Sequence, residues 1–150
     1  MKIKKLNFYD GFKNLSDRLL AILLLFVLSP LLITIGIIIY LNYGRPIFFY
    51  HVRPGYLKKP FRIFKFRSML NKYNNGNKFL SEEERITSFG KFLRNSSLDE
   101  IPSLINIFRG EMSFVGPRPL AMEYLPHYSR EQAKRHNVKP GLTGLAQVNG

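Results

Sequence analysis

An apolar run near the start of the chain constrains its fold most. The run extends from Leu19 to Leu41, and no charged residue lies between Arg18 and Arg45. It is long enough to cross the hydrocarbon core of a bilayer. It is too long for a typical signal peptide and lacks the small-residue cleavage site. We therefore expect residues 1–43 to form a membrane-associated segment with a hydrophobic helix over 19–41.

Ser29 and Pro30 fall near the middle of this run. A proline inside a helix breaks a backbone hydrogen bond and kinks the helix, and a nearby Ser can satisfy the freed carbonyl. Basic residues flank the run on both sides: Lys2, Lys4, Lys5, Lys13 and Arg18 before it, and Arg45, Arg53, Lys58, Lys59, Arg62, Lys65 and Arg67 after it. The positive-inside rule places both flanks in the cytoplasm. A re-entrant hairpin broken at Ser29-Pro30 satisfies both flanks, and a membrane-spanning helix is the alternative.

Charge limits the partners that this chain can have. The formal net charge of +13 indicates an anionic partner, which is nucleic acid, a lipid surface or a phosphorylated substrate. The uncharged run argues against a nucleic-acid-binding protein. Aromatic residues interleave with the basic ones over residues 1–18, as in a segment that lies at an anionic membrane surface, although a solvated basic tail has the same composition. The absence of Cys excludes thiolate chemistry, and three scattered His do not form a zinc site.

The rest of the chain reads as a small α+β domain. Residues 44–69 predict paired strands that turn at Pro54-Gly55, with Phe61, Ile63 and Phe64 alternating loosely with basic residues. Ser81 to Glu84 forms a capping-box helix start. Residues 120–138 read as a polar surface segment, helical over 129–136, and 139–144 as a loop whose glycines allow close approach to a ligand. We expect an N-terminal membrane helix followed by a catalytic domain, 44–150, on the cytoplasmic face, with short strands and amphipathic interfacial helices.

Asp99 and Glu100 form the only directly adjacent Asp–Glu pair in the sequence. Apolar residues follow at the spacing of one buried helical face: Ile101, Leu104, Ile105 and Phe108. The purely structural interpretation is a capping box between Ser97 and Glu100 at the start of a helix. The functional interpretation joins the two carboxylates to Arg118, which the stiff Gly116–Pro119 turn presents, in a site for phosphate and metal.

Several stretches together resemble the monotopic polyprenyl-phosphate phosphoglycosyl transferases, a family of bacterial sugar transferases. The matching pieces are, in chain order, Lys13…Asp17-Arg18, Ser29-Pro30, Gly44-Arg-Pro46-Ile-Phe-Phe49, Lys65-Phe-Arg67-Ser-Met69, Arg94-Asn-Ser-Ser-Leu-Asp99-Glu100-Ile-Pro102, Val115-Gly-Pro-Arg118-Pro119 and Lys139-Pro-Gly-Leu-Thr-Gly-Leu-Ala-Gln-Val-Asn-Gly150. The resemblance covers nearly the whole chain, and the order and spacing of the pieces are specific.

The resemblance implies a two-step transfer. An aspartate attacks a UDP-sugar, UMP leaves, and polyprenyl phosphate takes the phosphosugar from the aspartyl intermediate, which starts a lipid-linked surface glycan. By position, Asp99 is the nucleophile, Glu100 binds Mg²⁺, and Arg118 contacts substrate phosphate. Arg94 holds the dyad region in place. Lys65 and Arg67, in the matching stretch after the paired strands, are further candidates for substrate binding.

The resemblance also implies a place in the cell and a longer chain. The expected location is the bacterial cytoplasmic membrane, with an anionic lipid surface and other glycan-assembly enzymes as partners and no nucleic acid beyond the nucleotide donor. Members of the family continue past the Val-Asn-Gly at the end of this sequence, so we expect a chain truncated at its C-terminus. The alternative function is a catalytically inactive, membrane-anchored binding or scaffold protein of the same family.

Overall fold

The computed structural model describes residues 8–74 and 78–149, and it contains two compact units built from interleaved segments. The first unit comprises Met1–Val27, His51–Ile63 and Ser103–Gly150, and the second comprises Leu28–Tyr50 and Phe64–Pro102. Three of the basic residues of the predicted interfacial segment, Lys2, Lys4 and Lys5, lie outside the described residues, as do residues 75–77 and Gly150. The observed architecture mixes helices with small sheets, as an α+β fold requires.

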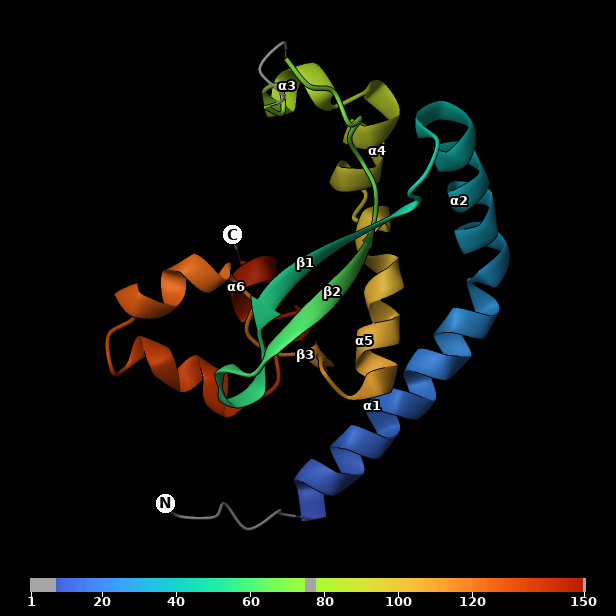
Figure 1. The fold of residues 1–150 in the computed structure, drawn as a ribbon. Coiled ribbons are helices and arrows are strands. Elements are labelled where there is room, and N and C mark those ends of the chain that lie inside the picture. The colour runs from blue at the N-terminus through green and yellow to red at the C-terminus, as the bar shows by residue number, and fades with distance from the viewer. Residues whose placement is uncertain (1–7, 75–77, 150) are drawn as a thin grey trace. The chain divides into compact units, whose positions relative to one another are not determined.

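The apolar run forms two helices, α1 (Phe8–Val27) and α2 (Ser29–Tyr43), which are interrupted at Leu28 (Figure 1). Pro30 lies in the first turn of α2, where its missing N–H removes no bond that the new helix needs. The Thr34 hydroxyl donates to the Pro30 carbonyl oxygen at 2.8 Å. Within residues 8–74 and 78–149, no single helix is long and apolar enough to cross a bilayer. The pair Gly11–Val27 and Ser29–Tyr43, bent by 62° at the break, meets the length and composition criterion only together.

The core of the second unit forms around one face of α2. Ile35 and Ile39 of α2 are buried against Phe66 and Leu93. Partly buried side chains surround this cluster: Leu32, Tyr43, Ile47, Phe89 and Leu98. Elsewhere on the same helix, large apolar side chains are exposed, including Leu41 at 75%. One helix thus supplies both part of a protein core and an uncovered apolar surface.

The predicted strand pair is confirmed. Strands β1 (Phe48–Pro54) and β2 (Pro60–Phe66) form a two-stranded sheet, and the short 3-10 helix η1 (Tyr56–Lys58) joins them (Figure 1). The alternation along β2 is also as expected, because Phe61 and Ile63 are buried while Arg62 is exposed.

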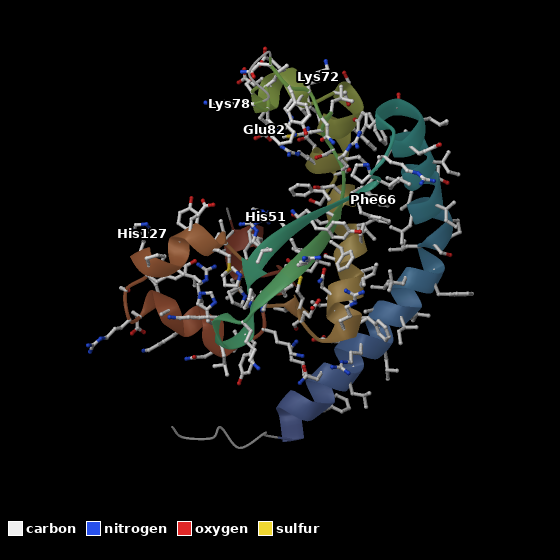
Figure 2. All side chains as sticks on the ribbon, in the orientation of Figure 1. His51, Phe66, Lys72, Lys78, Glu82 and His127 are labelled. Carbon is white, nitrogen blue, oxygen red and sulfur yellow. The ribbon has the colours of Figure 1, made fainter. Side chains whose placement is uncertain are left out.

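A loop region separates β2 from helix α4 (Ser88–Asn95). Isolated antiparallel bridges join Met69 to Ile86 and Tyr73 to Phe79. The predicted capping box is confirmed: Ser81 and Glu84 exchange side-chain to backbone hydrogen bonds at the start of α3 (Glu82–Arg85). Charged side chains such as Lys72, Lys78 and Glu82 gather around this region (Figure 2).

The first unit packs α1 along α5 (Leu104–Arg109) and pairs β3 (Ser113–Val115) in parallel with β4 (Gly141–Thr143). Its other elements are the 3-10 helices η3 (Met122–His127) and η4 (Gln132–Asn137) and the short helix α6 (Leu145–Val148). Two predictions need correction here. The predicted loop over 139–144 contains β4, and the helix predicted over 129–136 is replaced by a 3-10 helix that begins at Gln132.

The predicted buried face of the helix after the acidic pair is wrong in part. Leu104 is buried as expected, but Phe108 is 46% exposed and Ile107 is fully buried instead. The cause is Pro102, which has no N–H and lies inside a 3-10 helix, η2 (Leu98–Ser103), so that the α-helix begins only at Leu104. The helix ends at Gly110, which adopts the left-handed conformation with φ 79°.

Candidate active site

The acidic pair lies in the 3-10 helix η2 of the second unit. Ser97, just before it, has a left-handed backbone with φ 57°, unlike the extended backbone of a usual N-cap. The Glu100 carboxylate accepts from Lys65 Nζ at 2.6 Å. Since Lys65 lies on β2, a strand residue and a 3-10 turn residue from distant parts of the sequence meet at the pair.

Asp99 is the buried member of the pair, with 8% of its surface exposed. Burial raises the pKa of its carboxyl above the ordinary 3.8, and the negative charge of Glu100 acts in the same direction. The positive charges of Lys65 and Arg94 lower that pKa and oppose the effect of burial. A carboxylate in this environment is poorly solvated yet faces two cations, which suits a nucleophile that must approach an anionic phosphate.

Arg94 reaches this region from α4. Its Nε donates to the Ser68 hydroxyl at 3.0 Å, and its guanidinium forms an ion pair with Glu82. Gly90 makes the close seating of α4 possible, because a Cβ at this position would overlap the Ser68 carbonyl oxygen. These contacts are with Ser68 and Glu82, and the role of Arg94 in holding the dyad region in place stays a prediction.

Arg67 is buried, with its guanidinium bound to main-chain carbonyls. Nη1 donates to Pro46 at 3.1 Å, Nη2 donates to the Tyr43 carbonyl oxygen, and the guanidinium lies 5.5 Å from the centre of the Tyr43 ring. Burial lowers the pKa of Arg67. These contacts fasten the end of α2 to the end of β2. The predicted contact of Arg67 with substrate stays a prediction, and the observed role is to hold the connection between α2 and β1.

Arg118 belongs to the first unit, on the Gly116–Pro119 turn. The Gly141 N–H donates to the Pro117 carbonyl at 3.0 Å, and Arg135 Nη2 donates to the Arg118 carbonyl at 2.8 Å. A Cβ on Gly141 would overlap the backbone nitrogen of Gly116. Gly141, one of the glycines that were expected to allow a ligand to approach, therefore allows the backbone of this turn to approach instead. The hydrogen bonds from Gly141 and Arg135 hold the turn on either side of the Pro117–Arg118 peptide.

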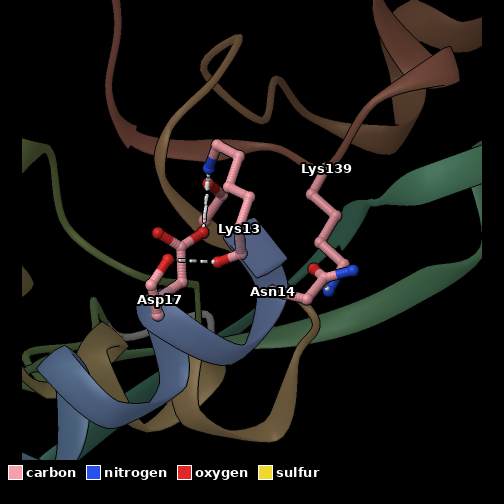
Figure 3. A network of polar contacts seen from close by, with 6 residues as sticks. Lys13, Asn14, Asp17 and Lys139 are labelled. Carbon is pink, nitrogen blue, oxygen red and sulfur yellow. Dashed lines mark hydrogen bonds and ion pairs between the residues drawn. The ribbon is translucent and has the colours of Figure 1, made fainter. Parts of the chain in front are cut away.

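A polar network docks the start of α1 on the same unit (Figure 3). Asp17 Oδ2 accepts from Lys13 Nζ at 2.9 Å and from the Ser113 hydroxyl at 2.7 Å, and Lys13 also contacts Ser113. Lys139 Nζ donates to Asn14 Oδ1 at 2.6 Å. Burial lowers the pKa of Lys139, and the charge of Arg18 lowers it further. The polar end of α1 is thereby fixed to the residues at the start of β3 and just before β4.

A sequence profile described as bacterial sugar transferase matches residues 8–150. The chain belongs to the bacterial sugar transferase family. Among its curated relatives, the uncharacterized sugar transferase EpsL of Bacillus subtilis is 46% identical over 92% of this chain and 68% of its own length. The UDP-glucose:undecaprenyl-phosphate glucose-1-phosphate transferase of Xanthomonas campestris is 42% identical over 96% of this chain. An undecaprenyl-phosphate N-acetylgalactosaminephosphotransferase of Aeromonas hydrophila is 36% identical over 93% of it.

The share of each relative that is matched differs widely. This sugar transferase chain spans 31% of the Xanthomonas protein and 34% of the Aeromonas protein. The names of these two relatives give the same acceptor, undecaprenyl phosphate, and two different sugars. Family membership therefore does not decide which sugar is handled.

The acidic pair fits a magnesium site in which water and substrate phosphates complete the coordination. Among residues 8–74 and 78–149, no three His, Asp or Glu side chains gather closely enough to enclose a metal. Mg²⁺ commonly binds through one or two carboxylates, several waters and substrate phosphates, and does not require an all-protein cage. In this sugar transferase, Asp99 and Glu100 offer that donor set.

Sequence reasoning missed one group of residues in the sugar transferase domain. His136 was placed on a polar surface segment, but it is buried and lines a small pocket together with Arg118. Arg53, at the end of β1, is close enough to Arg118 for their charges to interact. No sequence signal marks this group, because its members come from three separated stretches and none follows a helix or strand period.

Proposed function

We propose that this chain transfers a phosphosugar from a UDP-sugar to undecaprenyl phosphate through an aspartyl-phosphosugar intermediate. The observation that carries the proposal is the buried Asp99, whose pKa responds to the charges of Lys65, Arg94 and Glu100, in a member of the sugar transferase family. The donor and the acceptor are inferred from the substrates that the names of the relatives give. Such a transfer begins a lipid-linked surface glycan.

The first step forms one bond and breaks one. A carboxylate oxygen of Asp99 attacks the phosphorus that carries the sugar, and the bond from this phosphorus to the oxygen shared with the uridine-bearing phosphate breaks. UMP leaves with that electron pair. The positive charges of Lys65 and Arg94 oppose the effect of burial on the pKa of Asp99 and so favour the ionised carboxylate that attacks.

The second step repeats the displacement with a new nucleophile. An oxygen of undecaprenyl phosphate attacks the same phosphorus, and the bond to Asp99 breaks. The Asp99 carboxylate is regenerated, and the product is an undecaprenyl-diphosphate sugar. Splitting the transfer in this way means that the two bulky substrates never need to react with each other directly.

Glu100 is the residue that would hold Mg²⁺, with Asp99 beside it. When bound, Mg²⁺ supplies positive charge that offsets the repulsion between a carboxylate and a diphosphate. The ion pair with Lys65 fixes the Glu100 carboxylate in place. Arg118, on its braced turn, would contribute a guanidinium to substrate phosphate.

The bent helix pair supports a location at the membrane. We place α1 and α2 in the cytoplasmic leaflet as a re-entrant hairpin, because basic residues crowd both flanks and the break lies at Ser29-Pro30. The exposed apolar side chains of both helices, such as Phe26 and Leu41, would face lipid. This arrangement would hold the site at the level of the phosphate headgroup of the acceptor.

Mass spectrometry tests the proposal directly. The chain is purified in detergent with Mg²⁺ and incubated with a panel of UDP-sugars in the absence of a lipid acceptor. The expected result is an added phosphosugar mass on the peptide that contains Asp99, which would identify the nucleophile and the sugar together. If a folded sample gives no adduct with any donor, the binding or scaffold alternative is favoured.

Replacing Lys65 with Met should shift the pH dependence of transfer. The positive charge of Lys65 lowers the pKa of Asp99, so its loss raises that pKa and moves the acid limb of kcat/KM to higher pH. At neutral pH the rate should fall on the order of a hundredfold. Lys72→Met removes an exposed lysine and should leave the profile unchanged. An acid limb that stays in place in Lys65→Met would contradict this account of Asp99.

Replacing Pro30 with Ala should straighten the helix break. Alanine supplies the N–H that proline lacks and removes the ring that clashes with the preceding turn, so a continuous spanning helix becomes favourable. The chain has no Cys, so single cysteines placed in the two flanks can be labelled without background. Same-side labelling is expected in the parent and opposite-side labelling in Pro30→Ala. Same-side labelling in both would mean that Pro30 does not set the topology.

A further inference from the structure

The last residue of α2, Tyr43, is held by contacts to other elements of the second unit. Its hydroxyl shares a hydrogen bond with the Thr87 hydroxyl, and its carbonyl oxygen accepts from Arg67 Nη2. The centre of its ring lies 5.5 Å from the Arg67 guanidinium and 6.4 Å from the centre of the Phe89 ring. The end of α2 is therefore joined to the residue after β2 and to the start of α4, which lies beside it (Figure 1).

The Thr87 hydroxyl is the group that caps α4. Thr87 is the N-cap residue, and its Oγ1 accepts from the Gly90 N–H at 3.0 Å. The bond to Tyr43 holds the same hydroxyl from the side of α2. Both residues are half-buried, so water competes weakly for this contact. A side chain of α2 thus helps to set where α4 begins.

Helix α4 leads directly to the acidic pair. It ends at Asn95, and only Ser96 and Ser97 separate it from η2, which contains Asp99. Its last turn carries Arg94, whose positive charge acts on Asp99 against the effect of burial. A change in the position of α4 would therefore be passed to both Arg94 and Asp99.

Strand β2 brings a second cation to the same pair. Lys65 lies two residues before Arg67, and its Nζ donates to the Glu100 carboxylate at 2.6 Å. Arg67 donates to the Tyr43 carbonyl oxygen, so the end of β2 is fixed to the end of α2. Lys65 and Arg94 thus lie on the two elements whose ends are joined to Tyr43.

We propose that Tyr43 is a positioning residue for the transfer, and that its hydroxyl fixes α4 through Thr87 so that Arg94 and Asp99 keep their places. Because the reaction that Tyr43 serves is the attack by Asp99, this role rests on the proposed function. Tyr43 acts through its neighbours and makes no bond to a substrate. A residue of the membrane-associated helix then sets the alignment of the acidic pair.

The variant Tyr43→Phe tests this role, because it removes one oxygen and keeps both the ring and the main-chain bond to Arg67. The full chain in lipid nanodiscs is mixed with the UDP-sugar that labels the parent, and mass spectrometry follows the Asp99 adduct in time. The rate at saturating donor should fall roughly tenfold, while the donor concentration for half-maximal rate stays within about twofold, because misalignment slows the attack and leaves substrate contacts in place. Tyr40→Phe, the matched change at an exposed tyrosine one turn earlier on α2, should form the adduct at the parent rate.

A double-mutant cycle with Thr87 tests the route. Thr87→Val keeps the shape of the side chain but cannot accept from Gly90 or bond to Tyr43, so it should slow the adduct at least as much as Tyr43→Phe. The double variant should form the adduct at the rate of Thr87→Val, since the Tyr43 hydroxyl has no partner left to lose. Thr87→Ser keeps the hydroxyl and should retain the parent rate within about twofold. Losses that multiply in the double variant would contradict a route through Thr87.

Hydrogen exchange separates a local effect from a general loss of stability. The Gly90 N–H donates to Thr87 Oγ1, so Tyr43→Phe should speed the exchange of this amide roughly tenfold. Ile39 lies in the core of the same unit, and its amide should exchange as in the parent. Faster exchange at both positions, with adduct formation reduced only in proportion to the unfolded protein, would leave Tyr43 a purely structural role and remove the proposed one.

Adduct formation by Tyr43→Phe at the parent rate would overturn the inference, as would unchanged exchange at Gly90. A parent chain that forms no adduct with any donor removes the proposed function and, with it, the reaction that Tyr43 would serve. A parent chain that forms the adduct, together with a Tyr43→Phe variant that forms it equally fast, leaves the transfer intact and removes only the positioning role. Slower adduct formation with faster exchange at Gly90 alone is the expected result.

Discussion

An Asp99→Asn variant is expected to lose transfer by roughly 10³-fold or more and to form no covalent phosphosugar adduct. The amide has nearly the shape of the carboxylate but cannot attack phosphorus, so the substrates still bind while the first step fails. The measurement is the adduct mass on the peptide containing residue 99, together with turnover of a UDP-sugar in the presence of a polyprenyl phosphate. Undiminished turnover would remove Asp99 as the nucleophile.

The same variant should be at least as stable as the parent chain at neutral pH. Burial raises the pKa of Asp99 in the folded state, so the ionised carboxylate lowers stability above that pKa. Asparagine carries no charge, so the variant should have the higher free energy of unfolding above the pKa of Asp99. This difference between variant and parent should disappear as pH falls through that pKa. Thermal melts in detergent across this range check the sign. Glu83→Gln, at an exposed acid on α3, should change neither stability nor activity.

A Gly141→Ala variant is expected to lose about 3 kcal/mol of stability and most of its activity. The new Cβ would overlap the Gly116 nitrogen and the Thr143 carbonyl, so β4 could no longer pair with β3 at its present distance. The hydrogen bond from Gly141 to Pro117 would be lost with it, and the turn that presents Arg118 would move. Thermal unfolding and the Asp99 adduct assay measure the two effects.

Gly11→Ala is the matched control for this glycine substitution. A Cβ at Gly11, on the exposed surface of α1, would meet no atom within 4 Å. Alanine in place of glycine within a helix should stabilise the chain by about 0.5–1 kcal/mol. Equal melting temperatures for Gly141→Ala and the parent would mean that the β3–β4 pairing does not constrain the turn.

Local rules predicted the parts of this fold that local chemistry determines. The strand pair around Pro54-Gly55 and the capping box of Ser81 and Glu84 each depend on residues close in sequence, and each is present. Pro102 marks the limit of such rules. Its position was evident, but the 3-10 helix that it favours changed which side chains of the following helix are buried.

Contacts between stretches that are distant in the chain could not be predicted from the sequence. Residues 139–144 were predicted to form a loop that binds a ligand, but β4 within them pairs with β3 and stabilises the fold. No residue in this stretch indicates that β3 is its partner. Arg67 was predicted to contact substrate, yet its buried guanidinium donates hydrogen bonds to the carbonyls of Tyr43, at the end of α2, and of Pro46, in the connection to β1. At the acidic pair, adjacency and motif order predicted Asp99 and Glu100, while the pairing of Glu100 with Lys65 required the fold.

The shared core of α2 has a consequence for how this protein can be produced and how it can evolve. Ile35 and Ile39 supply hydrophobic contacts to the unit that carries Asp99, so a fragment starting after Tyr43 would leave Phe66 and Leu93 without their partners. A water-soluble version made by deleting the first helices should aggregate, and an anchor borrowed from an unrelated protein should not substitute for α2. With the proposed membrane attachment through α1 and α2, proteolytic cutting of these helices would therefore unfold the unit that carries Asp99 and would not release an active domain.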